Sequence, residues 1–438
     1  MKPDKVLAGA HKAPGSGMIV GLLALALFIN YLDRGNLATA APLIKDQMRL
    51  TNTQIGALGS AFFFVYAPGQ VMAGWVIARL NPYRTMAFSL ALWSLATMLS
   101  GLASGFAALL ALRLLLGLGE SASWPATSKL LAQHIAPEKL GSANAAILAG
   151  IYLGPALGTV LGAAFLARFG WRPMFVVFGG GSLLWLIPWL SGTRHASTAA
   201  SAQIHRREPP YRDLLCRRQL WGTTIGTFAG NYTWFLLITW LPLYLVKVQG
   251  LSLPVMGELA GLVYLLSSGL SLLFGRLSDV WMRAGATSHR VRMTMVCTGT
   301  VIGIGTMLAC ALGSAPVAIA GLLVFAFANG LCGFNFYAIG QTLSGPHAAA
   351  RWVGLQNGIG TLSGVVAPLV TGMIVDRTGS FSLAFVSAAV VGVAGLLAWI
   401  FLVRRIEPID WTAVQPTFSS PVAPAMSAQT APPVPPQR

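Results

Sequence analysis

Residues 27–42 read LFINYLDRGNLATAAP, an apolar stretch interrupted by two adjacent charges, Asp33 and Arg34. The stretch lies in an apolar run from 18 to 39, which is long enough to cross the roughly 30 Å hydrocarbon core of a bilayer as a helix. The run is too long for a secretory signal and lacks a small-residue cleavage pattern, so we expect a membrane span. A charge at the centre of such a helix costs about 2.5 to 3.5 kcal/mol, so this pair requires a physical explanation.

Similar apolar runs continue along the whole chain. Its 438 residues are 55% hydrophobic and only 9% charged, with a mean hydropathy of +0.68, which is too apolar for a soluble protein of this length. An all-α membrane protein with twelve transmembrane helices is therefore predicted. The expected spans are 18–39, 53–78, 83–104, 106–134, 140–166, 172–191, 221–247, 255–279, 290–312, 314–344, 351–375 and 380–404.

The net charge of +17 is distributed asymmetrically between the two sides of these spans. The two tails and the segments at the ends of the even-numbered spans hold 21 of the 29 Lys and Arg residues. This asymmetry follows the positive-inside rule and predicts an inner-membrane protein with both termini in the cytoplasm. Because the basic residues set the topology, no nucleic-acid partner is expected. The opposite side carries six basic residues, Lys45, Arg49, Arg168, Arg172, Lys247 and Arg377.

Polar segments divide the chain into two halves. Residues 192–220 are rich in Ser, Ala and Arg, and we expect them to form a cytoplasmic linker between six-helix bundles at 18–191 and 221–404. Residues 1–17 are expected to form a cytoplasmic tail. The Pro- and Ala-rich residues 405–438 are expected to be a disordered cytoplasmic tail.

The two halves match each other at one fixed offset of 213 residues. Five matches at a single shift, which include the rare residues His and Pro, indicate that a six-helix unit was duplicated. Two such bundles normally enclose a site near the middle of the bilayer. The matching pairs are Gly117 and Gly330, His134 and His347, Gly141 and Gly354, Asn144 and Asn357, and Pro155 and Pro368.

Four ionisable residues lie well inside the expected spans, all in the first half: Asp33, Arg34, Arg113 and Glu120. Unpaired, they would cost on the order of 10 kcal/mol, so we expect them to face one another or a water-filled cavity. Arg113 and Glu120 are two helical turns apart and share one face, whereas Asp33 and Arg34 point about 100° apart. Protonation of both acids would leave two arginines to hold a carboxylate, which would couple proton and anion. The alternative is a salt-bridge cluster that only fixes helix packing.

The loop after span 8 contains a family signature. Residues 274–285, FGRLSDVWMRAG, resemble the G-x-x-x-D loop of the major facilitator superfamily in Gly275, Asp279 and Arg283. The equivalent loop after span 2 has Ala78 where the acid is expected. The resemblance implies the major facilitator fold, in which two pseudo-symmetric six-helix bundles surround a central cavity, and implies a conformational role for this loop.

Three further motifs resemble the anion:cation symporter family, whose members carry sugar acids and other organic anions. They are NYLDRGNL at 30–37, RLLLGLGESASWP at 113–125 and TWLPLYLVKVQGLS at 239–252. In that family, the arginines of spans 1 and 4 are implicated in substrate binding and the acids in proton coupling. The resemblance therefore implies substrate-binding roles for Arg34, Arg113, Tyr31, Tyr66, Tyr337 and Asn357, and proton-coupling roles for Asp33 and Glu120.

Several of these residues also have a purely structural interpretation. Aromatic side chains in membrane helices often only pack, and amides such as Gln70, Asn231 and Asn335 can line a cavity or join two helices by hydrogen bonds. Gly150, Gly154 and Gly158 recur every four residues in span 5. Such a stripe of small residues favours close contact with another helix.

Together these features predict a proton-coupled symporter that imports a small organic anion, such as a hexonate, hexuronate or aldarate, by alternating access. Alternatives are an exporter or exchanger of organic acids, or an aromatic or dicarboxylate anion transporter of the same fold. The sequence contains no HExxH, GxSxG or Walker lysine motif and no CxxC pair, so neither an enzyme nor a metal or other cofactor is expected. The expected partners are the anion, protons and the lipid bilayer, and a monomer is expected.

Overall fold

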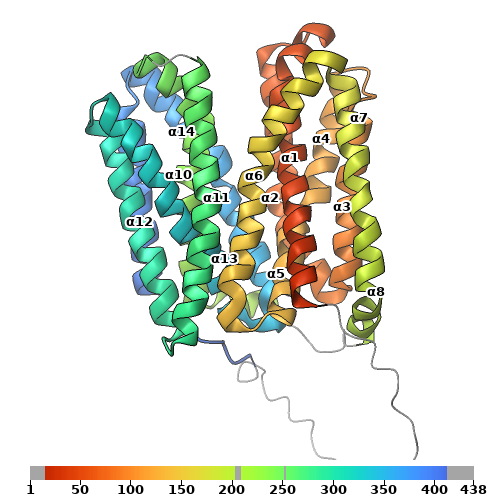
Figure 1. The fold of residues 1–438 in the computed structure, drawn as a ribbon, viewed down its shortest axis with the longest axis vertical. Helices are drawn as coiled ribbons and strands as arrows, with labels where there is room; N and C mark the ends of the chain where they lie inside the picture. The colour runs from red at the N-terminus through yellow and green to blue at the C-terminus, as the bar shows by residue number, and fades with distance from the viewer. Residues whose placement is uncertain (1–14, 203–208, 251–252, 412–438) are drawn as a thin grey trace, which may run out of the picture.

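The computed structural model describes residues 15–202, 209–250 and 253–411, and all regular structure in these ranges is helical. The helices form two bundles that stand side by side (Figure 1). The first bundle contains α1 (Ser16–Met48), α2 (Asn52–Arg79), α3 (Pro82–Ser100), α4 (Phe106–Glu120), α5 (Ser123–His134), α6 (Leu140–Phe169), α7 (Trp171–Ser182) and α8 (Leu186–Ala202). The second contains α10 (Arg218–Leu243), α11 (Leu253–Arg283), α12 (Ser288–Leu312), α13 (Ala315–Thr361), α14 (Ser363–Thr378) and α15 (Ser382–Leu397). Shorter elements are the 3₁₀ turns η1 (Pro137–Lys139) and η2 (Leu183–Trp185), α9 (Tyr211–Leu215), and the π-helical turns η3 (Tyr244–Val248) and η4 (Ala398–Val403).

The helices agree with the prediction of an all-α membrane protein. Within the described ranges, nine segments are long and apolar enough to cross a membrane, and one of them, Pro316–Thr378, covers two expected spans. The two expected spans that remain are occupied by α3 and α10. Twelve spans are therefore consistent with the observed helices.

Local sequence determines where several helices begin and break. A capping box starts α2, because the Thr51 hydroxyl accepts from the Gln54 N–H and the Gln54 side chain accepts from the Thr51 N–H. Asn81 caps α3 immediately before a proline. Gly345, with φ of 63°, interrupts α13 and thereby separates the two expected spans that this helix joins.

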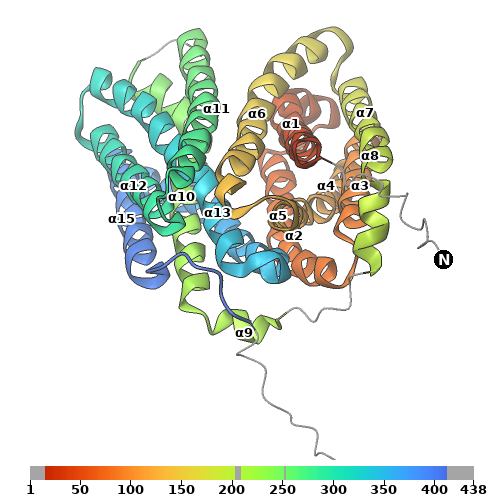
Figure 2. The same ribbon diagram turned by 60° about the horizontal axis from the view of Figure 1, so that its bottom comes forward.

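The first residues of the predicted linker are helical, and the first residues of the predicted disordered tail are held by hydrogen bonds. Helix α8 continues to Ala202, because the Ala- and Ser-rich residues that follow span 6 can extend a helix. Beyond η4, the Ile409 N–H donates to the Leu343 carbonyl and the Trp411 indole donates to the Ser344 carbonyl, at 2.9 Å each. This part of the tail is therefore ordered and lies near α9 (Figure 2). Residues 203–208 and 412–438, which belong to the same two predictions, lie outside the described residues.

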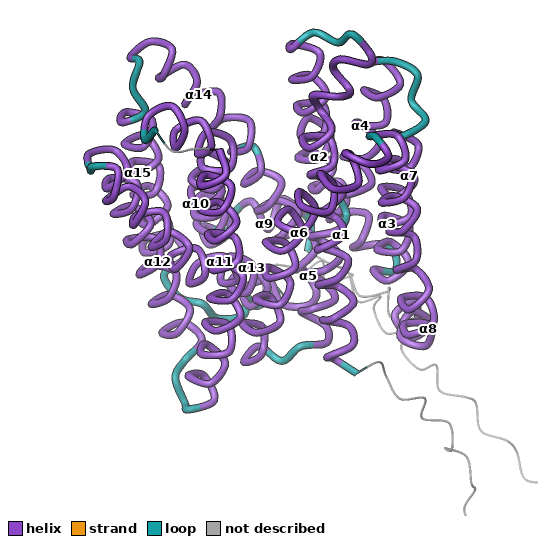
Figure 3. The backbone as a smooth tube through the Cα atoms, turned by 45° about the horizontal axis from the view of Figure 1, so that its top comes forward, coloured by secondary structure: helices purple, strands orange, loops and turns teal. Residues whose placement is uncertain are grey.

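The bundles contact each other near the end of the molecule at which the described chain begins and ends, which we call the tail end. Helices α2 and α5 pack against α13, and α6 packs against α11. Side chains join the bundles there, because the Asn144 amide donates to Gln341 at 2.7 Å and Gln341 donates to Ser128 at 3.2 Å. Towards the opposite end the bundles lean apart (Figures 1 and 3).

Paired glycines allow this close approach, in two places related by the internal repeat. A side chain at Gly141 of α6 would come within 2.6 Å of the Asp279 carboxylate on α11, and one at Gly354 of α13 would come within 2.7 Å of the Gln70 carbonyl on α2. At the first contact Asp279 accepts a hydrogen bond of 3.1 Å from the Ser142 N–H, at the start of α6. The Arg283 guanidinium donates to the backbone carbonyl of Asp279 and not to the Asp279 carboxylate.

The second contact lacks the acid, because Ala78 occupies the equivalent position. Linker residues contact the helices here instead. The Tyr211 hydroxyl donates to the Val71 carbonyl of α2, and Arg351 of α13 donates to the Pro209 carbonyl. The linker thus bridges the two bundles on the side where the loop signature is incomplete.

Replacing Gly275 with Val should favour a state in which the tail ends separate. A side chain at Gly275 would collide with Ala145 and come within 3.0 Å of the Gly141 carbonyl, so only separation of α11 from α6 makes room for it. We expect the ratio of separated to closed molecules to rise at least about tenfold. Pulsed spin-resonance distances between labels at the exposed Lys139 and Ala284 measure this ratio.

Gly269→Val is the matched control, because Gly269 lies on the same helix and faces open space. It should leave the label distances unchanged. An unchanged distance distribution in Gly275→Val would show that the glycine contact does not hold the tail ends together.

Candidate functional site

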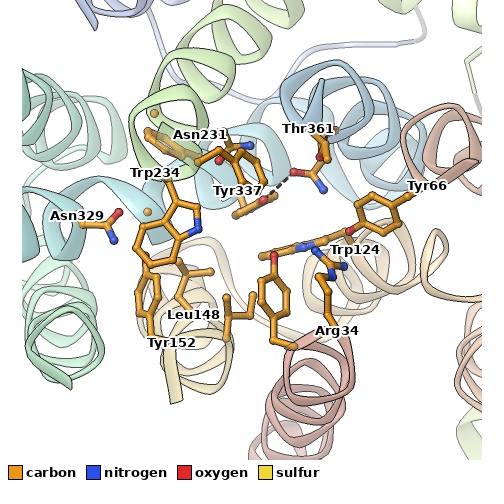
Figure 4. A pocket seen from close by; sticks show the side chains of 17 residues that line it. Arg34, Tyr66, Trp124, Leu148, Tyr152, Asn231, Trp234, Asn329, Tyr337 and Thr361 are labelled. Atoms are coloured by element: carbon orange, nitrogen blue, oxygen red, sulfur yellow. Dashed lines mark hydrogen bonds between the residues drawn. The ribbon is translucent and has the colours of Figure 1, made fainter. Parts of the chain in front are cut away.

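A cavity lies between the two bundles, and seventeen residues from both of them line it (Figure 4). Its empty volume, including space open to solvent, is about 640 Å³. The lining is rich in aromatic and amide groups, and Arg34 is the one charged residue among the described residues that line it. Of the residues predicted to bind substrate, Tyr31, Arg34, Tyr66, Tyr337 and Asn357 all line this cavity.

Arg34 forms an ion pair with Glu120 at the edge of the cavity. Its Nη2 and Nε lie 2.6 and 3.2 Å from Glu120 Oε2, and Nη2 also lies 3.3 Å from Asn30 Oδ1. Glu120 is completely buried, whereas the Arg34 side chain is 15% exposed. The cation therefore stands between the cavity and the buried carboxylate.

Three aromatic rings surround the Arg34 guanidinium. Its central carbon lies 4.5 Å from the centre of the Tyr31 ring, 4.6 Å from Phe62 and 4.8 Å from Tyr66. Cation–π contacts of this kind stabilise a desolvated cation by roughly 0.5 to 2 kcal/mol each. They hold the guanidinium in place without neutralising its charge.

The packing of α1 on α6 determines that Arg34 faces the cavity. Positions Gly150, Gly154 and Gly158 of α6 approach, in order, Ala24, Phe28 and Leu32 of α1, so the stripe of small residues packs as the sequence predicted. Successive residues rotate by about 100°, so Asp33 and Arg34 lie about 100° and 200° from the α6-facing Leu32. Only one member of the charged pair can therefore face the cavity.

Asp33 points away from the cavity into the first bundle. It is 1% exposed, and its carboxylate accepts from the Ser182 hydroxyl of α7 at 3.0 Å and from Asn36 at 3.4 Å. The expectation that the four intramembrane charges face one another or a water-filled cavity thus does not hold for Asp33. Asp33 points about 100° away from Arg34, as expected for consecutive helical residues, and this turns it towards α7.

Arg113 also lies outside the group of cavity-lining residues. Its Nε donates to the Leu58 carbonyl at 3.2 Å, and its guanidinium lies 5.6 Å from the centre of the Phe62 ring. Gly117, between Arg113 and Glu120, brings α4 so close to α2 that a side chain there would lie 2.5 Å from the Phe62 carbonyl. Helix α2 thus occupies the space beside Gly117, and Arg113 does not line the cavity in which the resemblance implies a substrate-binding role for it.

Replacing Arg113 with Lys should reduce stability more than binding. The variant loses a hydrogen bond from a buried charged group, which costs about 1.5 to 3 kcal/mol, but leaves the cavity lining intact. We expect a lower melting temperature and anion affinity within about twofold of the original protein. Thermal unfolding and equilibrium binding of the purified protein measure the two effects. A large loss of anion affinity without loss of stability would show that Arg113 does bind the substrate.

A stacked ring pair and a chain of hydrogen bonds form the tail-side wall of the cavity. Trp124 of α5 stacks on Tyr337 of α13, with ring centres 3.7 Å apart and planes at 12°. The Tyr337 hydroxyl donates to Asn357 at 2.8 Å, Asn357 donates to Gln70 at 2.6 Å, and Gln70 donates to Thr361 at 3.4 Å. These contacts join α2, α5 and α13 directly below the cavity.

Sequence reasoning missed several aromatic residues of the site. Trp124, Tyr152 and Trp234 line the cavity, whereas no charge or repeat distinguishes them from packing aromatics in the sequence. The one available signal was the position of Trp124, four residues after Glu120. Among the amide candidates, Asn231 lines the cavity, Gln70 lies behind it, and Asn335 donates to the Leu331 carbonyl of its own helix.

The described residues offer no centre for a metal. No group of three or more His, Cys, Asp or Glu side chains in the described ranges could hold an ion. The chemistry available to the cavity is therefore one cation with a buried acid behind it, phenol and amide groups, and aromatic faces.

Two helical bundles that span the bilayer and enclose a polar cavity define a membrane transporter. The chain belongs to the Major Facilitator Superfamily, whose family model matches residues 23–368. This membership agrees with the prediction of a transporter rather than an enzyme.

Proteins of similar sequence align with nearly the whole length of this chain. The hexuronate transporter of Bacillus subtilis is 30% identical over 89% of this chain and 94% of its own length. A probable L-galactonate transporter of Escherichia coli is 28% identical over 89% of each chain. The probable sulfoacetate transporter SauU of Cupriavidus necator is 29% identical over 88% of this chain and 93% of its own length.

Two solved structures share the fold. The crystal structure of the human organic anion transporter MFSD10 superimposes with a TM-score of 0.69 at 18% identity, covering 87% of this chain and 99% of that one. The structure of FucP in the outward conformation superimposes with a TM-score of 0.65 at 13% identity, covering 87% and 98%. At this level of identity the similarity concerns the fold alone.

Proposed function

We propose that this protein is a proton-coupled symporter that imports a small organic anion, with sugar acids as the leading substrate class. The sequence relatives support the substrate class, because their names include transporters of hexuronate, galactonate and sulfoacetate. The observation that carries the proposal is the ion pair between Arg34, which lines the cavity, and the buried Glu120.

The ion pair links anion binding to protonation. While Glu120 is ionised, its carboxylate occupies the guanidinium of Arg34. A proton on Glu120 removes this competing charge and leaves Arg34 free to hold a substrate carboxylate through charge-assisted hydrogen bonds. Charge balance in a medium of low permittivity therefore favours the loading of a proton and an anion together.

Asp33 is proposed as a second proton-binding residue that acts from outside the cavity. Its carboxylate lies between α1 and α7, where Ser182 donates to it. A change in its charge would act on the packing of α1, which carries Arg34, rather than on the anion directly. Helix α1 thus contacts the cavity through Arg34 and the interior of the first bundle through Asp33.

Phenol and amide groups supply contacts for substrate hydroxyls. Tyr31, Tyr66, Asn231 and Asn357 line the cavity from both bundles. Such groups both donate and accept, which suits the hydroxyls of a hexonate or hexuronate better than a second cation would. Because Arg34 is the one cation among the described residues that line the cavity, a monoanion is proposed to bind more tightly than a dianion.

The arrangement is proposed to be the outward-facing state of alternating access. The positive-inside pattern assigns the tail end to the cytoplasm. At that end the bundles are joined by Asn144, Gln341 and Asp279. Release to the cytoplasm then requires these contacts to open, which is the proposed role of Gly275, Asp279 and Arg283.

Uptake into proteoliposomes tests the proposal. Labelled D-gluconate, D-glucuronate, D-glucarate and sulfoacetate are supplied with and without an acidic exterior. We expect concentrative uptake of at least one monoanion that collapses when a protonophore removes the pH difference. Exchange without concentrative uptake would support the alternative of an exchanger, and no transport of any of these acids would contradict the proposed substrate class.

A further inference from the structure

A second chamber lies inside the second bundle, beside the central cavity. Its empty volume, including space open to solvent, is about 510 Å³, and residues of α10, α12, α13 and α15 line it. Half of the residues that line it are glycine or alanine, which keeps side chains out of the space between the four helices. On α12, Gly299, Gly303 and Met307 line it at intervals of four residues, so one face of this helix follows the chamber.

The chamber adjoins the central cavity and shares one wall with it. Gly230, Asn329 and Phe336 line both spaces. Arg34 and Asn329 lie towards opposite ends of the central cavity (Figure 4). A ligand held by Arg34 and extended across the cavity therefore points towards the second chamber.

The chemistry of the chamber favours an apolar ligand. None of the described residues that line it is charged. The hydroxyls of Thr233 and Thr300 donate to the carbonyls of Ala229 and Val296, and the Cys332 thiol also donates to Val296. Because these donors are directed at the backbone, they present methylene, methyl and sulfur surface. The Asn329 amide, at the wall shared with the central cavity, is the polar exception. Away from it, a buried substrate hydroxyl would find no partner to replace water.

We propose that this chamber is a binding subsite for the apolar arm of a monocarboxylate, such as an aryl or branched alkyl group, whose carboxylate is held by Arg34. The inference rests on the proposed function, and it extends the substrate class beyond hydroxylated sugar acids. Gly303 lines the subsite, and a side chain there would meet no atom within 4 Å, so a larger residue at this position would extend into the open space. Phe336, stacked on Trp399, forms the wall past which the arm extends.

Equilibrium binding to the full-length protein in lipid nanodiscs tests the subsite. Butyrate and 4-phenylbutyrate share a carboxylate and a three-carbon chain, so the difference between them reports the ring. We expect 4-phenylbutyrate to bind at least about tenfold more tightly, from burial of the ring. Gly303→Leu should abolish this advantage and leave the affinity for D-gluconate unchanged.

Gly305→Leu is the matched control. Gly305 lies on the same helix, is exposed, and also has open space beside it, so the ring advantage should persist in this variant. Should Gly303→Leu fail to fold, Gly303→Ala and Gly303→Val provide a graded series in which the advantage decreases with side-chain volume.

The remaining outcomes overturn the subsite in distinct ways. If the ring advantage survives in Gly303→Leu, the ring binds elsewhere, for example on Trp124 or Trp234 of the central cavity, and the proposed subsite is wrong. If D-gluconate binds but phenylbutyrate shows no advantage over butyrate, the subsite alone is refuted. If none of the three acids binds, the proposed function fails together with the subsite.

Discussion

Replacing Glu120 with Gln should abolish concentrative uptake while exchange of the anion continues. The amide cannot release or take up a proton, so the anion can no longer be coupled to a pH difference through this residue. Each coupled proton and each unit of pH difference contribute about 1.4 kcal/mol, or about tenfold accumulation, and this factor should be lost. Gln also leaves Arg34 without a competing carboxylate, so the anion still binds.

The measurement compares two assays on the same proteoliposomes. Uptake is driven by an acidic exterior in one assay, and by trapped unlabelled anion at equal pH in the other. Glu138→Gln is the control, because Glu138 is exposed in a 3₁₀ turn outside the cavity, and it should retain both activities. Concentrative uptake that persists in Glu120→Gln would assign the coupling proton to another residue.

Replacing Arg34 with Lys should weaken anion binding about 100-fold although the charge is kept. Arg34 directs two nitrogens at one carboxylate oxygen and lies among three rings. An ammonium group cannot reproduce this fork, and each hydrogen bond to a charged group is worth roughly 1.5 to 3 kcal/mol. Equilibrium binding of D-gluconate to the purified variant measures the loss.

Arg113→Lys serves as the matched comparison, since both variants exchange a guanidinium for an ammonium group inside the first bundle. The structure places only Arg34 at the cavity, so the two substitutions should differ at least about tenfold in their effect on affinity. Equal losses in the two variants would mean that both arginines hold the anion, as the sequence resemblance implies.

The two bundles contribute different chemistry despite their common origin. The first supplies Arg34 and the buried Glu120, whereas the second supplies Asn231, Trp234 and Tyr337 to the cavity. The tail-end contacts are also unequal, because Asp279 binds the start of α6 on one side and the linker bridges α2 and α13 on the other. The two halves thus share a frame, whereas their charged residues and their tail-end contacts differ.

Sequence alone was sufficient to predict the membrane helices, and five of the six residues that it assigned to substrate binding line the cavity. Apolar runs of span length are a local property, because the bilayer requires each helix to satisfy its own backbone and to be apolar over about 20 residues. The stripe of Gly150, Gly154 and Gly158 likewise indicated a helix contact without naming the partner. The sequence also indicated Arg34 as a functional candidate, because placing a charge at this depth in the bilayer costs free energy whichever way the side chain points.

The tertiary structure decided which charges share a site. Arg34 and Glu120 are 86 residues apart and meet only because α1 is rotated by its contact with α6, which turns Asp33 towards Ser182. Arg113 is on the same helix as Glu120 but is directed at the Leu58 carbonyl. Sequence spacing fixes the relative angles of side chains on one helix, whereas the rotation of that helix about its own axis depends on its neighbours.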